Sequence, residues 1–249
     1  MKCRGFLSSE SLLQNASDDA VFSLYGGGLG DRWGATSFLL RLSEATGRPS
    51  KIAGDSDSVL EFAQMLDTNG SVEATRQPAT IRIGSPRQVV EKVYGNFEDD
   101  LSILPWAEVF RLPYLQTRWR WRPNVDGLVC VHLTPSKTGL TTCPGRHVLM
   151  LREALEAVGY VMREFGPNLS LQQNLEIAAS AEFFVGIDSG PSHLVHSVGI
   201  PMHLVRNHLP LHHIRSTHHG KAFCVYRDLL EFVASSVLTG LRPSSGHRL

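Results

Sequence analysis

One short segment of the chain gathers an acid, two hydroxyls, a proline and an imidazole within six residues. It is the run DSGPSH, residues 188–193, and it follows an apolar run at residues 183–187 that is typical of a buried strand. Proline is tolerated in the first turn of a helix, so the run predicts a turn that opens a helix. Free N–H groups at the helix start and the His193 imidazole suit a diphosphate, whereas the Asp188 carboxylate suits sugar hydroxyls. The purely structural alternative is a capped turn with a core histidine.

A second candidate segment is rich in glycine. Residues 26–34 read GGGLGDRWG and lie between a strand pattern at residues 20–25 and a helix pattern at residues 34–46. Glycine lets the backbone approach a ligand closely, and a helix start presents N–H groups and a positive dipole. Two interpretations stay open: a ligand-binding loop, or a tight strand-to-helix turn in which Asp31 is the N-cap.

Three glycines of this segment, Gly28, Gly30 and Gly34, also fit a loose GxGxxxG. Dinucleotide-binding folds carry such glycines, with an acid about 20 residues further on that binds the ribose. Asp55 and Asp57 are the acids at that distance. This pattern supports an alternative function, that of an NAD(P)-dependent oxidoreductase.

Strand and helix patterns that position these segments alternate twice along the chain. The first set predicts strands at residues 20–25, 51–54 and 80–83 and helices at 34–46 and 59–66. The second set predicts strands at residues 127–133, 160–164, 183–187 and 202–205 and helices at 148–158, 170–181 and 193–198. Such alternation predicts α/β units with parallel sheets.

The stretch 112–123 interrupts the alternation with two prolines, two tryptophans and three arginines, and we place a domain boundary there. We therefore expect a polar tail or short helix at residues 1–19 and two α/β domains, at 20–122 and 123–249; the family resemblance given below implies that the first is the acceptor-side domain and the second the nucleotide-sugar-binding domain. Within the boundary stretch, residues 119–122 read WRWR. They could stack on a sugar acceptor or pack as a hinge, and both interpretations stay open.

The two candidate segments together carry a resemblance to a known family. Residues 169–201, LSLQQNLEIAASAEFFVGIDSGPSHLVHSVGIP, resemble the C-terminal signature of the heptosyltransferase-like glycosyltransferases, family 9. That signature is a helix, a strand, Asp-Ser/Thr-Gly-Pro-x-His, a short helix and Gly-x-Pro. Residues 26–42, GGGLGDRWGATSFLLRL, resemble the first loop of the same family over a shorter stretch.

The resemblance implies a GT-B fold, in which two Rossmann-like domains face each other across a cleft. It also implies metal-independent transfer, with inversion, from a nucleotide-diphosphate sugar to a saccharide or glycolipid acceptor. The family's first-loop acid, the general base, corresponds to Asp31, on the loop that contains Gly27, Gly28 and Gly30. The donor-binding residues that the resemblance implies are Asp188, Ser189, Gly190 and His193, and the helix start at Ser192 adds N–H groups.

The chain departs from the family at the start of the second domain. Family members commonly carry a Lys-x-Trp-Pro-like element there, whereas residues 141–144 of this chain read TTCP. We expect Lys137, four residues earlier, to supply the missing cation for the diphosphate. The departure, with the short chain, also supports a second alternative, a catalytically inactive GT-B saccharide-binding module.

Charge and hydropathy restrict the partners. Lys plus Arg and Asp plus Glu number 24 each, so no global basic field would bind nucleic acid. We expect no transmembrane segment. Peripheral contact with the inner face of a membrane stays open. The N-terminal residues show no export signal and the four cysteines are scattered, which favours reduced thiols and a cytoplasmic location. The resemblance to family 9 implies a role in polysaccharide or glycolipid biosynthesis.

We expect neither a metal nor a cofactor. Acid pairs occur at Asp99-Asp100 and at Asp55 and Asp57, all in the first domain and away from the predicted donor segment. A histidine-rich loop lies near the C-terminus, and three roles stay open for it: a metal site, a basic rim for an anion, or a solvated loop. Its residues are His208, His212, His213, His218 and His219, with Arg206, Arg215 and Lys221 nearby.

Overall fold

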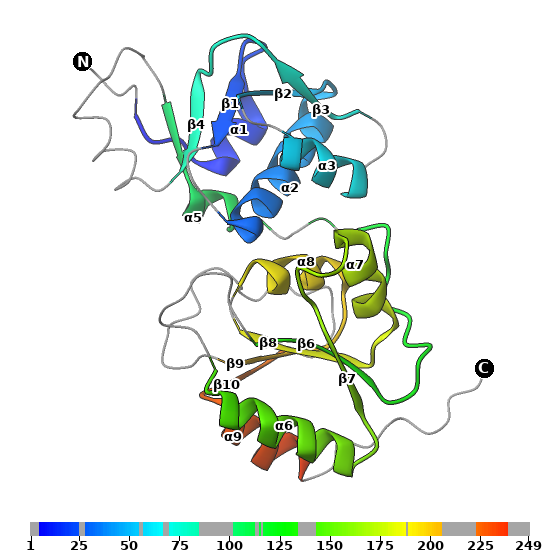
Figure 1. Cartoon of the computed structure of the whole chain (residues 1–249). Coiled ribbons are helices and arrows are strands. Elements are labelled where there is room, and N and C mark those ends of the chain that lie inside the picture. The colour runs from blue at the N-terminus through cyan, green and yellow to red at the C-terminus, as the bar shows by residue number, and fades with distance from the viewer. Residues whose placement is uncertain are drawn as a thin grey trace. The chain divides into compact units, whose positions relative to one another are not determined.

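The structure is a computed structural model, and it describes residues 5–24, 28–54, 57–66, 70–84, 102–112, 115, 117–133, 143–187, 189–205 and 223–238. The chain divides into two compact units, Met1–Arg118 and Trp119–Leu249. Within the described ranges, each unit contains one parallel five-stranded sheet (Figure 1). The predicted α/β class with parallel sheets is confirmed.

The first unit is ordered β3-β2-β1-β4-β5 across its sheet. Its elements are α1 (Ser9–Asn15), β1 (Val21–Leu24), α2 (Leu29–Thr46), β2 (Ser50–Ala53), α3 (Asp57–Leu66), β3 (Val72–Thr75), β4 (Ile81–Gly84), β5 (Ser102–Pro105) and α5 (Trp106–Val109). The core side chains come from the strands and from the buried face of α2, with Phe22, Phe38 and Ile83 at its centre. The sequence patterns did not predict β3, β5 or α5.

Helix α2 begins five residues before the predicted start at residue 34. Its N-cap is Gly28, so Asp31 is the third helical residue and its interpretation as the N-cap is wrong. Gly34 lies inside the helix, where a Cβ atom would come within 2.6 Å of the Phe110 ring just after α5. The last glycine of the segment therefore permits close packing of a helix rather than a loop.

The two bulky residues after Asp31 attach α2 to α3. The Trp33 side chain is fully buried and its ring meets that of Phe62 edge-on, with centroids 5.2 Å apart. Arg32 Nη1 donates a hydrogen bond of 2.7 Å to Ser58 Oγ. These contacts fix the start of α2 from the side, because both partners belong to α3.

Of the two forms expected for the N-terminal segment, a polar tail or a short helix, the structure shows the short helix. Ser8 caps α1 by accepting a hydrogen bond from the Ser11 N–H, and Leu12 is buried. Before the helix, the Leu7 N–H donates to the Ile103 carbonyl in β5 at 2.8 Å. The described part of the segment is thus packed into the first unit.

The second unit is ordered β10-β9-β8-β6-β7 across its sheet. Its elements are β6 (Leu128–His132), α6 (Gly145–Ala157), β7 (Val161–Glu164), α7 (Leu171–Ser180), β8 (Phe183–Ile187), α8 (Gly190–Val198), β9 (Met202–Val205), β10 (Phe223–Tyr226), α9 (Leu229–Phe232) and a π-helical turn, Val233–Val237. Helices α7 and α8 contact each other on one face of the sheet, and α6 and α9 contact each other on the other face (Figure 1). The predicted strands and helices of this unit are confirmed, whereas β10 and α9 were not predicted.

Two local signals in this unit are confirmed in detail. Ser170 and Gln173 form the predicted capping box at the start of α7, each side chain accepting from the other residue's backbone N–H. Gly199 ends α8 in the left-handed conformation, with φ 84°, which glycine adopts without steric cost. These caps set the ends of the two helices that flank β8.

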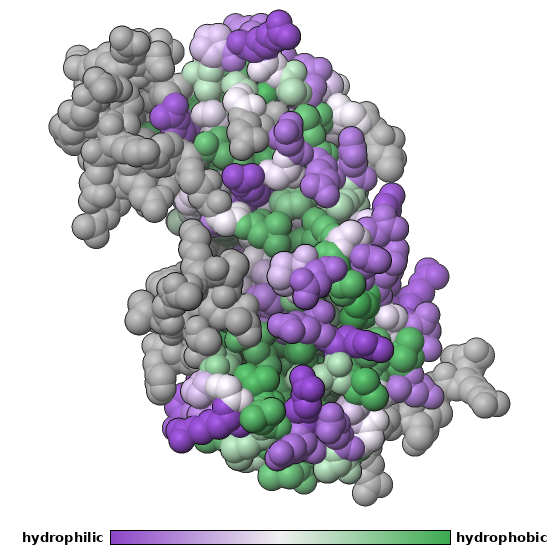
Figure 2. Space-filling view, viewed as in Figure 1, coloured by the Kyte–Doolittle hydropathy of each residue, from purple (hydrophilic) through white to green (hydrophobic). Residues whose placement is uncertain are grey.

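On the face drawn in Figure 2, hydrophilic and apolar side chains are interspersed over the described surface of both units. Within the described part of the chain, no helix combines the length and the apolar content that a membrane span needs. The described cysteines, Cys130, Cys143 and Cys224, are free thiols. Burial raises the pKa of the Cys130 thiol, so that thiol stays protonated and unreactive.

A buried histidine makes the stability of the second unit depend on pH. His203 of β9 is 9% exposed; its Nδ1 lies 3.1 Å from the Tyr226 hydroxyl and its ring packs on Phe232. Burial lowers its pKa to about 4. On acidification, the unfolded chain therefore binds a proton at His203 near pH 6.5, at a higher pH than the folded chain does. The free energy of unfolding therefore decreases as the pH falls from 6.5 towards 4.

We expect the free energy of unfolding to fall by about 2 kcal/mol more in the wild type than in His203→Gln between pH 7 and pH 5. Urea unfolding of both proteins at the two pH values measures this difference. Equal pH dependence of the two proteins would show that His203 titrates normally in the folded state.

Candidate functional site

The strand orders locate where each unit can bind a ligand. In the first unit the chain builds outward from β1 to β3 and then returns to β4 on the other side of β1. In the second unit the order reverses between β6 and β8. Open parallel sheets bind ligands at the carboxyl ends of the strands beside such a reversal. The two segments singled out in the sequence follow β1 and β8, so both lie at these positions.

The first position carries a carboxylate at the start of a helix. The Asp31 Oδ2 atom accepts a hydrogen bond of 2.7 Å from the Gly28 N–H, so the third helical residue of α2 caps the N–H of the N-cap residue. The Asp31 side chain is half-buried. Its second oxygen can accept a further hydrogen bond, for example from a hydroxyl group. Gly28 and Gly30 flank it as N-cap and second helical residue.

The second position presents a helix start of the opposite character. Ser189 is the N-cap of α8 in extended conformation, and no described side chain caps the helix. The first turn contains no acid, and Pro191 occupies it as predicted. The N–H groups of Gly190 and Ser192 belong to this turn, where an α-helix leaves its amides without intrahelical partners. The N-terminal end of α8 therefore favours an anion.

The side chains of the predicted donor segment divide between structure and site. The Ser192 hydroxyl is buried and donates to the Ile187 carbonyl, which closes the turn from β8 into α8. A contact of Ser192 with a donor would therefore use its backbone N–H. His193 is 5% exposed, one turn into the helix. Ser189 and Gly190 are half-buried.

Sequence reasoning missed one titratable residue beside this segment. His132 is the last residue of β6, pairs in register with Gly186 of β8 and is 8% exposed. Its Nδ1 lies 2.8 Å from the Phe165 carbonyl, which can only accept, so Nδ1 carries the proton. Burial lowers the pKa of His132, although the hydrogen bond and Glu164 oppose it. The available signal was a polar residue at the end of an apolar strand pattern.

Several predicted site residues lie outside the described residues. They are Gly27, Lys137, Asp188, Asp55, Asp99, Asp100 and the histidine loop from His208 to His219. In the sequence, Lys137 is the fifth residue after β6 and Asp188 is the first residue after β8. Within the described ranges, no three His, Cys, Asp or Glu residues gather as metal ligands.

The WRWR segment belongs to the second unit and packs against the ends of its helices. The Trp121 indole N–H donates to the Ala181 carbonyl at 2.8 Å, and its backbone N–H donates to the Val198 carbonyl at 3.1 Å. Trp121 thus has the packing role that one interpretation gave to both tryptophans. Trp119 instead lines a groove beside α7.

Comparisons with known proteins find similarity in structure only. No protein-family model matches the sequence, and no curated protein matches it. The dodecameric iron-containing glycosyltransferase TibC of enterotoxigenic E. coli H10407 superposes with a TM-score of 0.52 at 16% identity, over 82% of this chain and 64% of TibC. This chain thus spans slightly less than two thirds of the TibC chain.

Two further structures are similar over more of their own length. A family 9 glycosyltransferase of Veillonella parvula DSM 2008 gives a TM-score of 0.53 at 12% identity, over 84% of this chain and 86% of the other. E. coli heptosyltransferase WaaC, solved with ADP, gives 0.54 at 12% identity, over 88% of this chain and 98% of WaaC. At this identity the likeness shows the fold: GT-B-like, with two Rossmann-like units. The predicted fold class and the resemblance to family 9 are confirmed at that level.

Proposed function

We propose that this chain is a glycosyltransferase that moves a sugar from a nucleotide-diphosphate sugar to a saccharide or glycolipid hydroxyl. The observation that carries the proposal is the contrast between two helix starts, each at the carboxyl ends of a parallel sheet. The start of α2 carries the Asp31 carboxylate. The first turn of α8 carries no acid, and His193 is the fourth residue of this helix. A hydroxyl group fits the first and a diphosphate fits the second.

The proposed reaction is a single displacement. The acceptor oxygen attacks the anomeric carbon from the face opposite the diphosphate, the bond from that carbon to the diphosphate oxygen breaks, and the configuration inverts. Asp31 accepts the proton that the acceptor hydroxyl loses. The amides of the α8 start and His193 stabilise the negative charge that develops on the diphosphate, and Lys137 adds a cation. Asp188 binds hydroxyls of the donor sugar.

The position of Asp31 also disfavours the oxidoreductase alternative. In a dinucleotide-binding fold the pyrophosphate lies at the start of the helix after the first strand. Here the Asp31 carboxylate occupies that start and accepts the Gly28 N–H. A pyrophosphate would meet a negative charge and lose this N–H donor, so the glycines fit a sugar acceptor better than NAD(P).

The first test is a titration of the purified chain with nucleotide sugars, nucleoside diphosphates and NAD(P). ADP-heptose is the first donor to try, because TibC was solved with ADP-D-β-D-heptose and WaaC with ADP. We expect one nucleoside diphosphate and its sugar to bind, NAD(P) not to bind, and the bound donor to release its diphosphate slowly to water. Binding of NAD(P) would support the oxidoreductase, and donor binding without any release would support the inactive module.

The same release assay tests whether a metal takes part, which TibC's description as iron-containing makes pertinent. The described residues of this chain offer no cluster of metal ligands, and amides with cations can neutralise a diphosphate without one. We expect activity to survive prolonged EDTA treatment. Loss of activity that Mg²⁺, Mn²⁺ or Fe²⁺ restores, but simple salt does not, would contradict metal-independent transfer.

A further inference from the structure

Helices α6 and α9 carry a large share of the exposed apolar side chains. Nine large hydrophobic side chains are exposed in the described part of the chain, and four of them belong to these two helices and to the end of the π-helical turn after α9. They are Leu149, Met150, Leu230 and Leu238, which are 61%, 46%, 39% and 70% exposed. Because α6 contacts both α9 and the turn, their outer sides form one surface, which we call the α6–α9 face.

The outer side of α6 combines an apolar pair with two opposite charges. Arg146, Leu149, Met150 and Glu153 are all exposed and follow one another at steps of three and four residues, so they share one side of the helix. Leu151, on the opposite side, is fully buried in the core. The apolar pair thus lies between an arginine one turn before it and a glutamate one turn after it.

The outer side of α9 and of the turn after it continues the apolar surface. Leu230, Ala234 and Leu238 are exposed and recur every four residues, whereas Phe232 between them is fully buried. In Figure 2 the surface over α6 and α9, at the lower end of the view, combines apolar and hydrophilic side chains. Neighbouring exposed apolar residues rimmed by polar ones are typical of an interaction surface.

The charges on α6 favour a second copy of the chain as the partner. A two-fold axis that passes between Leu149 and Met150 pairs two α6 helices in antiparallel directions. Residues equally far from the axis then face each other, so Arg146 of each copy meets Glu153 of the other, and Leu149 meets Met150. Within one chain Arg146 and Glu153 are two helical turns apart, about 10 Å, and do not pair. The face is therefore complementary to itself.

The same charges disfavour a lipid surface as the partner. Helices that lie on anionic membranes carry mainly Lys and Arg beside their apolar side. The charged residues of α6 and α9 are instead three glutamates and two arginines, and all five are exposed: Glu153, Glu156, Glu231, Arg146 and Arg152. An anionic membrane would gain no net attraction from this set.

We propose that the α6–α9 face is the interface of a homodimer, in which two copies pack these helices against each other about a two-fold axis. The 13 residues of α6 make a helix about 20 Å long, and two helices side by side are about 20 Å wide. The face thus covers about 400 Å² in projection, less than the about 800 Å² per partner of a standard interface. We therefore expect a dimer that dissociates with a Kd of about 1–100 μM. It forms whether or not the chain transfers sugar.

Sedimentation equilibrium of the full chain from about 1 to about 500 μM tests the proposal. We expect the wild type to be dimeric at the upper end and to dissociate on dilution. Leu149→Glu combined with Met150→Glu brings carboxylates of both copies together at the axis, so this variant is expected to stay monomeric. Both side chains are exposed in the single chain, so we expect the variant to keep the circular dichroism spectrum of the wild type. A wild type that is monomeric at every concentration would overturn the proposal.

Charge reversal tests the pairing of the helices. Arg146→Glu and Glu153→Arg are each expected to weaken the dimer about tenfold, because each places like charges across the interface. The two substitutions combined restore opposite charges between the copies, so the double variant is expected to recover the Kd of the wild type. Losses that add in the double variant would contradict the two-fold arrangement and overturn the proposal.

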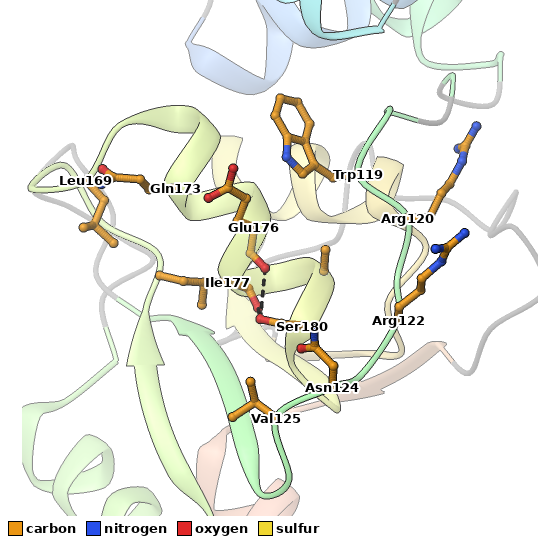
Figure 3. A pocket seen from close by; sticks show the side chains of 11 residues that line it. Trp119, Arg120, Arg122, Asn124, Val125, Leu169, Gln173, Glu176, Ile177 and Ser180 are labelled. Carbon is orange, nitrogen blue, oxygen red and sulfur yellow. Dashed lines mark hydrogen bonds between the residues drawn. The ribbon is translucent and has the colours of Figure 1, made fainter. Parts of the chain in front are cut away.

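Val125→Asp is the matched control. Val125 is also an exposed apolar residue of the second unit, but it lines the groove beside α7, on the other face of the sheet (Figure 3). We expect this variant to dimerise as the wild type does. A dimer that is lost in Val125→Asp and kept in the α6 variants would place the interface elsewhere and overturn the proposal.

Flotation with vesicles of phosphatidylethanolamine and phosphatidylglycerol tests the membrane as the other partner. We expect the wild type to stay in solution, because the charges of α6 and α9 give no net attraction to anionic lipid. Flotation of the wild type that the Leu149→Glu and Met150→Glu double variant abolishes would assign the face to a membrane and overturn the homodimer.

Discussion

Asp31→Asn is expected to lower the rate of sugar transfer by about 10²–10⁴-fold, the range typical of losing a general base. Asparagine keeps an oxygen that can accept the Gly28 N–H, so the start of α2 is retained. What the variant loses is the charge and the ability to take a proton. Donor affinity is expected to stay within a few-fold, because the proposed donor site belongs to the second unit.

A matched control exists in the same unit. Asp57 is also an acid in the first turn of a helix, α3, and it is exposed. Asp57→Asn is therefore expected to transfer sugar at the wild-type rate, as measured by release of the nucleoside diphosphate. Asp31→Ala separates the two roles further, since it also removes the cap and is expected to cost about 1 kcal/mol of stability. Wild-type turnover by purified Asp31→Asn would exclude Asp31 as the base.

The glycine segment shows where local reasoning reached its limit. Several glycines in nine residues predict a turn, because glycine is a poor helix former. In the structure α2 nevertheless includes Gly30 and Gly34, since Trp33 is buried against α3 and Gly34 lies against Phe110. Tertiary contacts from residues far along the chain decide the start of this helix. The sequence therefore predicted the helix, but neither its first five residues nor the place of Asp31 in its first turn.

The second candidate segment was easier to predict, because its signals are local. The capping box of Ser170 and Gln173, the apolar run of β8 and the end of α8 at Gly199 each depend on neighbours in sequence. The strand order is different, since no local pattern states which strand lies beside β6. Only the order shows that β6 and β8 are neighbours, which places His132 beside Gly186 at the end of β8.

Asp188 and His193 are expected to act on different parts of the donor, and substituting them is expected to separate those parts. His193→Ala is expected to weaken the free nucleoside diphosphate and the nucleotide sugar equally, because His193 belongs to the α8 start that binds the diphosphate. Asp188→Ala is expected to weaken the nucleotide sugar more than the free diphosphate, because its carboxylate binds sugar hydroxyls. Each loss is expected to be about 10- to 100-fold, as for a hydrogen bond to a charged group worth about 1.5–3 kcal/mol.

The burial of His193 requires a second variant, since alanine would also leave a cavity where the imidazole is buried. His193→Gln fills most of that space and keeps a hydrogen-bond donor but cannot carry a positive charge. If His193 acts through charge, the glutamine variant loses donor affinity while its free energy of unfolding stays near that of the wild type. His147→Ala is the control, because His147 belongs to α6 on the other face of the sheet. Calorimetry with both ligands decides the assignment. An equal loss for the diphosphate and the nucleotide sugar in Asp188→Ala would contradict its contact with the sugar, and unchanged affinities in both His193 variants would move the diphosphate away from α8.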